Sequence, residues 1–308
     1  MLSEQLKDIL SGLVSGGILF DESMRNHTSL AIGGNVDALF VPRNVGDLRN
    51  VMLLTTENRV SATVIGNGTN LLVSDEGIDG IIIKIADCFN TVSFKGRKIR
   101  SGAGCSLSVL SKLALDKSLS GLEFTTGIPG TVGGAVANNA GTHGEAMDSI
   151  VTKVEVLNLR GETAELTRSE LDFGYRRSVF QEINMAITSV ELELREGVKS
   201  DIEQRIRRNR QQRHGKFPLN LRSAGSIFKN PSGGYAGNLI ESCGCKGMSV
   251  GGAEVSELHA NFIVNKGSAS ALDVLNLMQM IKDEVFKEYG IKLEPEISII
   301  GKGIDVYR

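Results

Sequence analysis

The sequence predicts a protein that mixes helices and strands along its whole length, of the α+β or α/β class. Short β-branched runs such as 81–85 alternate with stretches whose apolar residues recur every three or four positions. The 308 residues are 41% hydrophobic and 23% charged, which is typical of a soluble globular chain of about two domains. A formal net charge of −2 argues against a dedicated nucleic-acid-binding protein, which normally carries a strong basic excess.

The first expected element is a helix at the N-terminus. Its apolar face holds Leu2, Leu6, Ile9, Leu10 and Leu13. Glu4, Lys7 and Asp8 interrupt this apolar stretch, so the segment does not read as a signal peptide. No later run approaches the roughly 18 apolar residues that a membrane span needs. We therefore expect a soluble, cytoplasmic protein without membrane insertion.

The elements that follow can be placed from their patterns. Strands are expected at 38–42, 60–65, 81–85, 99–102, 151–157, 185–194 and 293–299, and helices at 107–114, from Ser200 and from Ser270. The helix from Ser200 is strongly basic, and we interpret it as the linker into a last domain. Ser270 and Asp273 have the spacing of a capping box, and Gly290 stands where that helix should end.

Two glycine-rich segments are candidates for ligand binding. Gly66-Asn67-Gly68-Thr69-Asn70 follows a strand and offers backbone N–H groups, a hydroxyl and amides to phosphate oxygens, although a plain turn is the alternative. The segment Gly127-Ile128-Pro129-Gly130-Thr131-Val132-Gly133-Gly134-Ala135 lets backbone lie flush against a ligand, and the amides of Asn138 and Asn139, which follow it, can reach polar ring atoms. Tight packing between elements is the alternative for this segment. Together the two segments suggest a large ligand with a diphosphate and a ring system.

Polar residues later in the chain add candidate chemistry. Tyr175-Arg176 offers a guanidinium fork suited to a carboxylate. Ser226 lies between small residues with Lys229 and Asn230 nearby, and it lacks the hydrolase pattern G-x-S-x-G. The four cysteines, Cys88, Cys105, Cys243 and Cys245, lack the spacing of a zinc site, so we interpret them as reduced thiols and expect no metal.

In combination these segments resemble one flavoenzyme family. The matching stretches, in order, are 26–29 with 32–34, 66–72, 127–135, 175–176, 225–226 with 228–231, 239–240 with 246–247, and 293–296. They cover nearly the whole chain and are similar to the UDP-N-acetylenolpyruvoylglucosamine reductase family, in its shorter (type II) form. Phe217-Pro218, Arg222 and Asn238 depart from the family pattern, which bears on the contacts to the substrate diphosphate.

The resemblance implies a fold and an activity. The fold is the α+β FAD-binding fold of the vanillyl-alcohol-oxidase and p-cresol-methylhydroxylase type, with FAD-binding subdomains at 1–88 and 89–212 and a substrate domain at 213–308. The implied enzyme holds FAD noncovalently and takes hydride from NADPH. It reduces the enolpyruvyl group of a nucleotide sugar to give UDP-N-acetylmuramate, in peptidoglycan precursor synthesis.

The resemblance also implies roles for residues. The implied catalytic residues are Arg176, Ser226 and Glu296. The implied FAD-binding residues are Gly66, Asn67, Gly68, Thr69, Asn70, Gly127, Ile128, Pro129, Gly133, Gly134, Ala135 and Asn138. The implied substrate contacts are Tyr175, Lys229, Asn230, Lys246 and His259.

Two other functions stay open at this point. One is an oxidase or dehydrogenase of the same flavin fold, in which His27 or His143 attaches the flavin covalently. The other is a binder of nucleotide sugars or phosphates without catalysis. The set of Arg176, Ser226 and Glu296 disfavours both.

Overall fold

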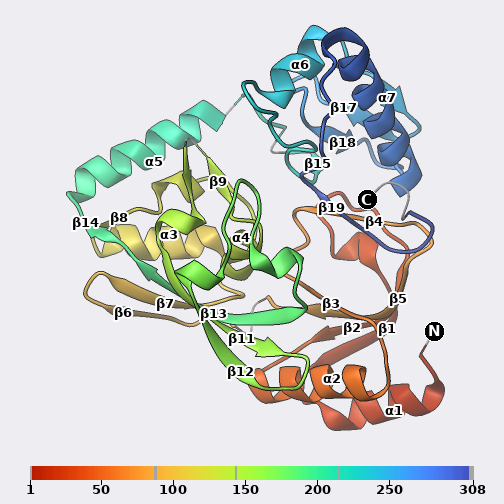
Figure 1. Cartoon of the computed structure of the whole chain (residues 1–308), viewed down its shortest axis with the longest axis vertical. Helices are drawn as coiled ribbons and strands as arrows, with labels where there is room; N and C mark the ends of the chain where they lie inside the picture. The colour runs from red at the N-terminus through yellow and green to blue at the C-terminus, as the bar shows by residue number, and fades with distance from the viewer. Residues whose placement is uncertain (1, 87–88, 143, 214, 219, 305–308) are drawn as a thin grey trace. The chain divides into compact units, whose positions relative to one another are not determined.

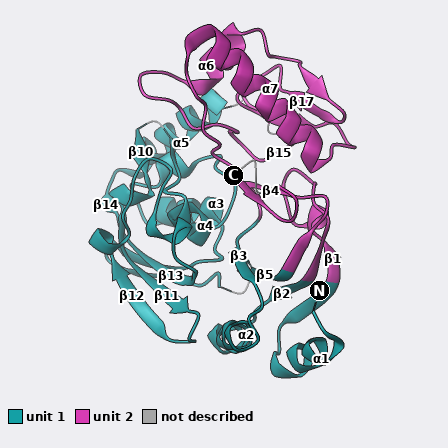
Figure 2. Ribbon diagram, turned by 45° about the vertical axis from the view of Figure 1, so that its right-hand side comes forward, with its two compact units in different colours: residues 1–20, 38–67, 80–213 teal, residues 21–37, 68–79, 214–308 magenta. Residues whose placement is uncertain are grey.

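The computed structural model describes residues 2–86, 89–142, 144–213, 215–218 and 220–304. These residues divide into two compact units, shown in teal and magenta in Figure 2. The first unit comprises 1–20, 38–67 and 80–213, and the second comprises 21–37, 68–79 and 214–308. The expected three-part division at 88 and 212 stays a prediction. It differs from the two-unit division because 21–37 and 68–79 group with the C-terminal residues.

The N-terminal sheet has the strand order β1-β2-β5-β3 (Figure 1). Its strands are β1 (Gly17–Ser23), β2 (Asn35–Val41), β3 (Ala62–Ile65) and β5 (Ile78–Lys84), and the helices before and between them are α1 (Glu4–Leu13) and α2 (Val45–Glu57). Strands β3 and β5 run parallel, so Ile65 and Lys84 pair at the same end. Phe40, Leu48 and Ile81 are fully buried in this part of the core. The glycine segment from Gly66 therefore leaves the carboxyl end of a parallel strand.

The second sheet of the first unit is antiparallel, in the order β12-β11-β13-β7-β6. Its strands are β6 (Val92–Lys95), β7 (Lys98–Gly102), β11 (Val151–Asn158), β12 (Thr163–Thr167) and β13 (Met185–Glu193). The short helix α4 (Val132–Ala137) packs on β7 and β13. The spacing of Leu107, Leu110, Leu113 and Ala114 predicts one apolar face for the helix α3 (Leu107–Asp116). Three of these residues are buried, and Leu113 is half-buried.

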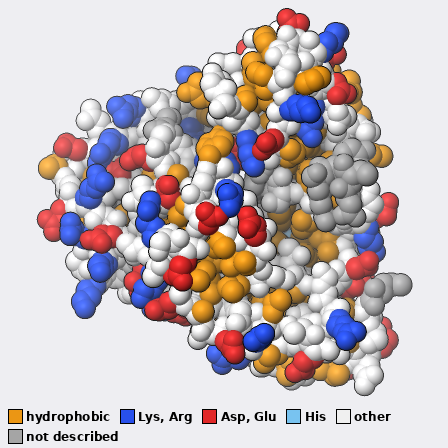
Figure 3. Space-filling model, viewed as in Figure 1, with side chains coloured by type: hydrophobic (Ala, Val, Ile, Leu, Met, Phe, Trp, Pro, Cys, Tyr) orange, Lys and Arg blue, Asp and Glu red, His pale blue; other side chains and the backbone are white. Residues whose placement is uncertain are grey.

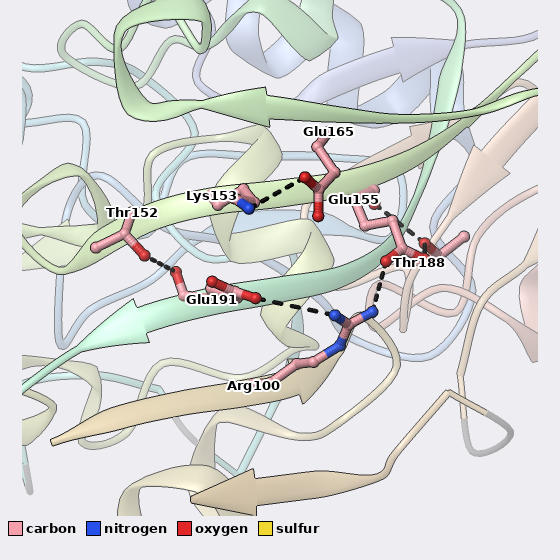
Figure 4. Close-up of polar contacts among 7 residues, drawn as sticks. All are labelled: Arg100, Thr152, Lys153, Glu155, Glu165, Thr188 and Glu191. Atoms are coloured by element: carbon pink, nitrogen blue, oxygen red, sulfur yellow. Dashed lines mark hydrogen bonds and ion pairs between the residues drawn. The ribbon is translucent and has the colours of Figure 1, made fainter. Parts of the chain in front are cut away.

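Charged residues project from four neighbouring strands of this sheet, β7, β13, β11 and β12, and Figure 4 shows them close together. Arg100 on β7 pairs with Glu155 at 2.5 Å and with Glu191 at 3.8 Å. Lys153 pairs with Glu165 across β11 and β12 at 3.1 Å. These ion pairs lie on the solvated face of the sheet. Exposed pairs of this kind contribute little to the free energy of folding.

The remaining elements of the first unit surround the two sheets. They are the strands β8 (Leu119–Ser120), β9 (Gly141–Thr142), β10 (Glu145–Ala146) and β14 (Arg195–Glu196), the single-turn helices η2 (Glu123–Thr125), η3 (Met147–Ser149), η4 (Arg168–Glu170) and η5 (Val179–Gln181), and the helix α5 (Lys199–Arg213). Helix α5 begins one residue before the expected Ser200, which therefore lies in its first turn. Blue basic side chains follow α5 along the left of the face in Figure 3.

The second unit is built around a four-stranded antiparallel sheet, β15-β18-β17-β16. Its elements are η1 (Met24–Asn26), β4 (Leu71–Val73), β15 (Arg222–Ser223), α6 (Ala236–Ser242), β16 (Ser249–Val250), β17 (Ala253–Val255), β18 (Ile263–Asn265), α7 (Ala271–Tyr289) and β19 (Ser298–Ile300). The predicted capping box of Ser270 and Asp273 is confirmed, as is the end of α7 at Gly290, where φ is 67°. Within the described residues, no helix combines the length and apolar character that crossing a membrane requires.

Candidate functional site

A cavity of about 100 Å³ lies in the first unit where β3 ends, α4 begins and β13 starts. Its wall includes Gly66, Thr131, Gly133, Gly134, Phe180 and Met185. The cavity therefore joins two glycine segments that lie about sixty residues apart in the sequence. Ligand pockets typically measure roughly 300–1,000 Å³, so this cavity accommodates only a portion of a large ligand. A larger hollow of about 300 Å³, lined by Arg97, Arg168 and Arg195, contains none of the predicted site residues.

The glycines of the first segment are required by close backbone and side-chain approach. A Cβ atom on Gly66 would lie 2.5 Å from Oγ1 of Thr131. Gly68 has a φ of +63°, and its Cβ would lie 2.0 Å from the carbonyl oxygen of His27. Asn67 between them is exposed. Both glycines are therefore needed for the loop to hold its shape before any ligand is considered.

The first turn of α4 uses its N–H groups within the protein. The N–H groups of Val132 and Gly133 donate to the carbonyls of Cys105 and Ala103, each at 2.8 Å. The N–H of Gly134 donates to Oγ1 of Thr131 at 3.2 Å. A Cβ on Gly133 would also lie 2.9 Å from the Cβ of Ala103. Tight packing, the alternative weighed from the sequence, thus accounts for Gly133, while the bare surface of Gly134 borders the cavity.

Other residues predicted to bind cofactor have structural partners. The amide of Asn138 donates to the Gly134 carbonyl at 3.0 Å and so ends α4. Ile128 packs against the core, and Ala135 is buried. Gly127 and Pro129 are exposed. Their part in holding a cofactor stays a prediction.

Tyr175 and Arg176 form the tip of a tight turn. The flanking residues Gly174 and Arg177 exchange backbone hydrogen bonds of 3.0 and 3.1 Å. Arg176 has a φ of 54°, which is unfavourable for a residue with a side chain. Its guanidinium donates to the Gly141 carbonyl at 2.7 Å and lies 5.2 Å from the centre of the Tyr175 ring. Strained positions that their surroundings enforce are frequent at functional sites.

Asn139, whose amide the sequence offers to a ligand beside that of Asn138, instead holds this turn in place. Its amide donates to the Gly174 carbonyl at 2.9 Å, and its Oδ1 accepts from the N–H of Asp148 at 3.0 Å. Ser178 assists by donating from its hydroxyl to the Ala137 carbonyl at 2.6 Å. Asn139 is buried and has a φ of 42°. The end of α4 therefore positions the Arg176 turn.

In the second unit the segments of Ser226 and Glu296 run side by side and antiparallel. The N–H of Glu296 donates to the Ile227 carbonyl at 2.8 Å, and the N–H of Lys229 donates to the Glu294 carbonyl at 2.9 Å. Ile227 is buried, whereas Ser226 and Glu296 are half-buried. The fold thus brings together two predicted catalytic residues that lie seventy positions apart.

Asn261 is a residue whose importance the sequence analysis missed. Its buried amide donates to the Phe228 carbonyl at 2.8 Å, and its Oδ1 accepts from the Phe228 N–H at 3.0 Å. Its own carbonyl accepts from the N–H of Ile227 at 2.9 Å. The side chain mimics a neighbouring strand and fixes the backbone beside Ser226.

The predicted substrate contacts of the second unit already have partners. Lys229 lies 3.6 Å from Glu294, and Lys246 donates to Glu241 at 2.6 Å. Oδ1 of Asn230 accepts from the N–H of Ala236 and so holds the start of α6.

His259 lies in an aromatic cluster. Its ring stacks on Phe217 at 4.8 Å and meets Phe262 edge-on at 5.1 Å. Its Nδ1 accepts from the N–H of Asn261, which leaves Nε2 to carry the proton of the neutral ring. Phe217, one of the noted departures, thus packs directly on a predicted substrate residue.

The residues that would favour the rival functions are engaged or inert. Nε2 of His27 lies 2.9 Å from Glu22, whose pKa is lowered by hydrogen bonds from Asn26 and His27. His143 and Cys88 lie outside the described residues. Burial raises the pKa of Cys105 and Cys243, and it raises that of Cys245 to about 11. These three thiols are therefore protonated near neutral pH.

Comparisons with known proteins match both parts of the chain. The sequence model of an FAD binding domain matches residues 36–167, and that of the UDP-N-acetylenolpyruvoylglucosamine reductase C-terminal domain matches residues 217–300. These matches confirm the predicted fold class, in which an FAD-binding domain precedes a second, C-terminal domain.

Individual relatives extend the similarity to almost the full length. The chain is 46% identical over 285 residues to the UDP-N-acetylenolpyruvoylglucosamine reductase of Alkaliphilus oremlandii, covering 92% of this chain and 94% of the relative. It is 42% identical to that of Bacillus subtilis, covering 93% and 95%. The crystal structure of the reductase from Thermus caldophilus superposes with a TM-score of 0.79 at 36% identity, covering 93% of this chain and 99% of that one.

Proposed function

Because this chain belongs to the UDP-N-acetylenolpyruvoylglucosamine reductase family, we propose that it reduces the enolpyruvyl group of UDP-N-acetylenolpyruvoylglucosamine at the expense of NADPH. The product is UDP-N-acetylmuramate, and the pathway is peptidoglycan precursor synthesis. The chain is an FAD-dependent oxidoreductase, in keeping with its FAD-binding domain. We further propose a cytoplasmic enzyme whose ligands are nucleotides and a nucleotide sugar, with no role for nucleic acid.

The residues around the cavity fit an FAD molecule held without a covalent bond. Gly66, Gly133 and Gly134 border the cavity without side-chain bulk, and Phe180 and Met185 give it an apolar wall. Flat ring systems bind in such apolar, glycine-lined places. The matched FAD-binding domain includes both glycine segments.

Arg176 has the properties that the reduction requires. When bound, FAD supplies a hydride, received from NADPH, to the methylene carbon of the enolpyruvyl group. The electrons of the carbon–carbon double bond then move toward the substrate carboxylate, where negative charge develops. A guanidinium binds a carboxylate through two parallel hydrogen bonds and stabilises this charge more as it grows.

Ser226 and Glu296 are proposed to complete the reaction on the adjacent carbon. The enolate carbon must take a proton, and we assign its delivery to the Ser226 hydroxyl. Glu296 supports this delivery from the neighbouring segment. The two segments are joined by a hydrogen bond of 2.8 Å from the N–H of Glu296 to the carbonyl of Ile227. Lys229, half-buried on the same segment, adds a positive charge that favours a serine oxygen losing its proton. The pairing of these two segments is the observation that carries the proposal.

The remaining predicted residues are proposed to bind the substrate. Tyr175 presents an exposed ring beside Arg176, and Nε2 of His259 offers a donor from the second unit. Asn230 and Lys246 contribute an amide and an ammonium group. Their existing partners, Ala236 and Glu241, pre-order both side chains.

The test is an absorbance experiment on the purified protein. We expect a flavin spectrum that NADPH bleaches anaerobically and that UDP-N-acetylenolpyruvoylglucosamine restores. Acid denaturation should release free FAD into the supernatant. Flavin that precipitates with the protein would support the covalent oxidase, and a colourless protein that cannot be reconstituted would support the binding protein.

A further inference from the structure

Helix α5 presents a polar stripe to the segment that precedes the second glycine-rich loop. Arg205, Asn209 and Arg213 recur every four residues and so share one helix face. Arg205 pairs with Glu123 at 2.6 Å, and the amide of Asn209 donates to the Glu123 carbonyl at 2.9 Å. The basic helix is therefore more than a solvated linker, because one stripe of it is specifically engaged.

Arg213, the last residue of this stripe, reaches the loop itself. Its Cδ and Nε lie 2.9 Å from the position that a Cβ on Gly127 would occupy. Gly127 has a φ of +76°, so both its conformation and its missing side chain make room for the guanidinium. The first glycine of Gly127-Ile128-Pro129-Gly130 is thus explained by an arginine that lies 86 positions later.

Thr126 adds a second polar group at the same place. Its hydroxyl oxygen is buried and has no hydrogen-bond partner among the described residues. Buried hydroxyl groups are normally hydrogen-bonded, because leaving one unsatisfied costs free energy. The hydroxyl directly precedes Gly127 and can donate to an acceptor that arrives with a ligand.

Two charged side chains lie near Gly127, those of Glu123 and Arg213. Glu123, the acidic residue of the preceding turn, is already paired with Arg205. Arg213 is half-buried, and burial lowers the pKa of its guanidinium. The ordinary pKa of arginine is so high that the group nevertheless stays charged near neutral pH. A guanidinium and a hydroxyl together form a donor pair suited to an anionic oxygen.

We propose that Arg213 and Thr126 bind an anionic oxygen of FAD, and this inference rests on the proposed function. The oxygen belongs either to the diphosphate or to the flavin ring, which gains negative charge on reduction. Thr126 lies within the matched FAD-binding range, whereas Arg213 lies between the two matched ranges, 36–167 and 217–300. Arg213 is therefore a cofactor determinant that neither family model covers.

The test compares FAD retention by the holoenzyme across two pairs of variants. Arg213→Gln should weaken FAD binding by about tenfold to a hundredfold, since hydrogen bonds to charged groups are the strong ones. Arg210→Gln, an exposed arginine on the same helix, is the control and should bind FAD like the wild type. Thr126→Val should also lose FAD more readily, whereas Thr126→Ser should retain it. Retention is measured by flavin fluorescence after repeated ultrafiltration.

The midpoint potential of the bound flavin separates the two sources of the anionic oxygen. A lower potential in Arg213→Gln supports contact with the flavin ring, and an unchanged potential with weaker retention supports the diphosphate. Wild-type retention and potential in both Arg213→Gln and Thr126→Val would overturn the inference. A raised KM for NADPH or for the nucleotide sugar with normal FAD retention would overturn it too. The proposed function fails separately, if the wild-type protein binds no FAD.

Discussion

The side-chain amide of Asn70 donates a hydrogen bond of 3.1 Å to the backbone carbonyl of Glu296. The backbone extends this link, because the N–H of Ser298 donates to the Asn70 carbonyl and β19 continues parallel to β4. Asn70 was predicted to bind cofactor and Glu296 to act in catalysis. Inside the second unit, these hydrogen bonds join the end of the first glycine segment to the segment of Glu296.

Asn70→Ala should therefore impair the substrate half-reaction as well as stability. Removing the amide leaves the Glu296 carbonyl without this donor, and such a loss typically costs about 1 kcal/mol of unfolding free energy. We expect a lower midpoint in urea denaturation and slower flavin reoxidation by the enolpyruvyl substrate. Asn276→Ala is the matched control, because Asn276 is an exposed asparagine on helix α7 of the same unit. Equal effects of the two variants would argue against the specific role of Asn70.

Arg176→Ala should slow turnover by about 10²–10³-fold, the usual effect of removing one donor to a developing negative charge. NADPH-driven flavin reduction should change far less, since no enolate forms in that half-reaction. Arg176→Lys should also fail to restore normal turnover, because an ammonium group cannot make the bidentate contact. The measurement is steady-state turnover alongside anaerobic stopped-flow reduction.

Arg177→Ala is the control for this turn. Arg177 is exposed and pairs with Asp172, and it occupies the flank of the turn instead of its tip. Its loss should leave turnover nearly normal. A comparable loss in both variants would mean that the turn had merely been disturbed.

Much of the fold was predictable because local signals specified it. The capping box at Ser270 and the left-handed Gly290 follow from short-range patterns, and both are observed, as is the apolar face of α3 except for the half-buried Leu113. Strand length was less predictable. A strand was expected at 293–299, but the strand β19 covers only Ser298–Ile300. Pro295 forms an isolated bridge with Phe228, and only residues 298–300 pair with β4.

The motifs of the candidate site could be predicted from the sequence, but the residues that hold these motifs in place could not. Asn139 and Asn261 act through side-chain bonds to backbone 35 and 33 residues away, and no local pattern reports such pairing. The contact of Gly127 could not be predicted from the sequence either. A glycine-rich loop predicts close approach, and whether the approaching group is a ligand, a backbone or Arg213 depends on the tertiary fold.

The capping box of α7 predicts a defined pH dependence of stability. Hydrogen bonds from Ser270 and Gly252 hold the pKa of Asp273 below its ordinary value, against the opposing effect of burial. A carboxyl group whose pKa is lowered by folding stabilises the protein above its unfolded pKa, and this contribution is lost as the pH falls through the lower, folded value.

Asp273→Asn should therefore be destabilised relative to the wild type at pH 7, and the gap should narrow below about pH 4, near the ordinary pKa of Asp. Urea denaturation at pH 7 and pH 3 measures both differences. Asp283→Asn on the exposed part of the same helix is the control and should show a smaller effect. A gap that is unchanged at pH 3 would show that Asp273 does not act through its charge.

Ser226→Ala should separate the two half-reactions most clearly. The flavin takes its hydride from NADPH without help from a proton donor to the substrate, so anaerobic bleaching by NADPH should proceed at nearly the wild-type rate. Reoxidation by the enolpyruvyl substrate requires a proton on the second carbon. It should slow by about 10²–10⁴-fold, the usual contribution of general acid catalysis. Glu296→Gln should slow the same half-reaction, because its segment is hydrogen-bonded to that of Ser226.

Ser232→Ala provides the matched control for this prediction, since Ser232 lies on the same loop and is exposed. Stopped-flow absorbance of the two half-reactions, with far-UV circular dichroism of each variant, distinguishes a chemical effect from a structural one. Equal slowing of both halves in Ser226→Ala would indicate damage to the segment that Asn261 holds. Normal reoxidation would remove the Ser226 hydroxyl from the mechanism and leave Lys229 or a water held by Glu296 as the proton source.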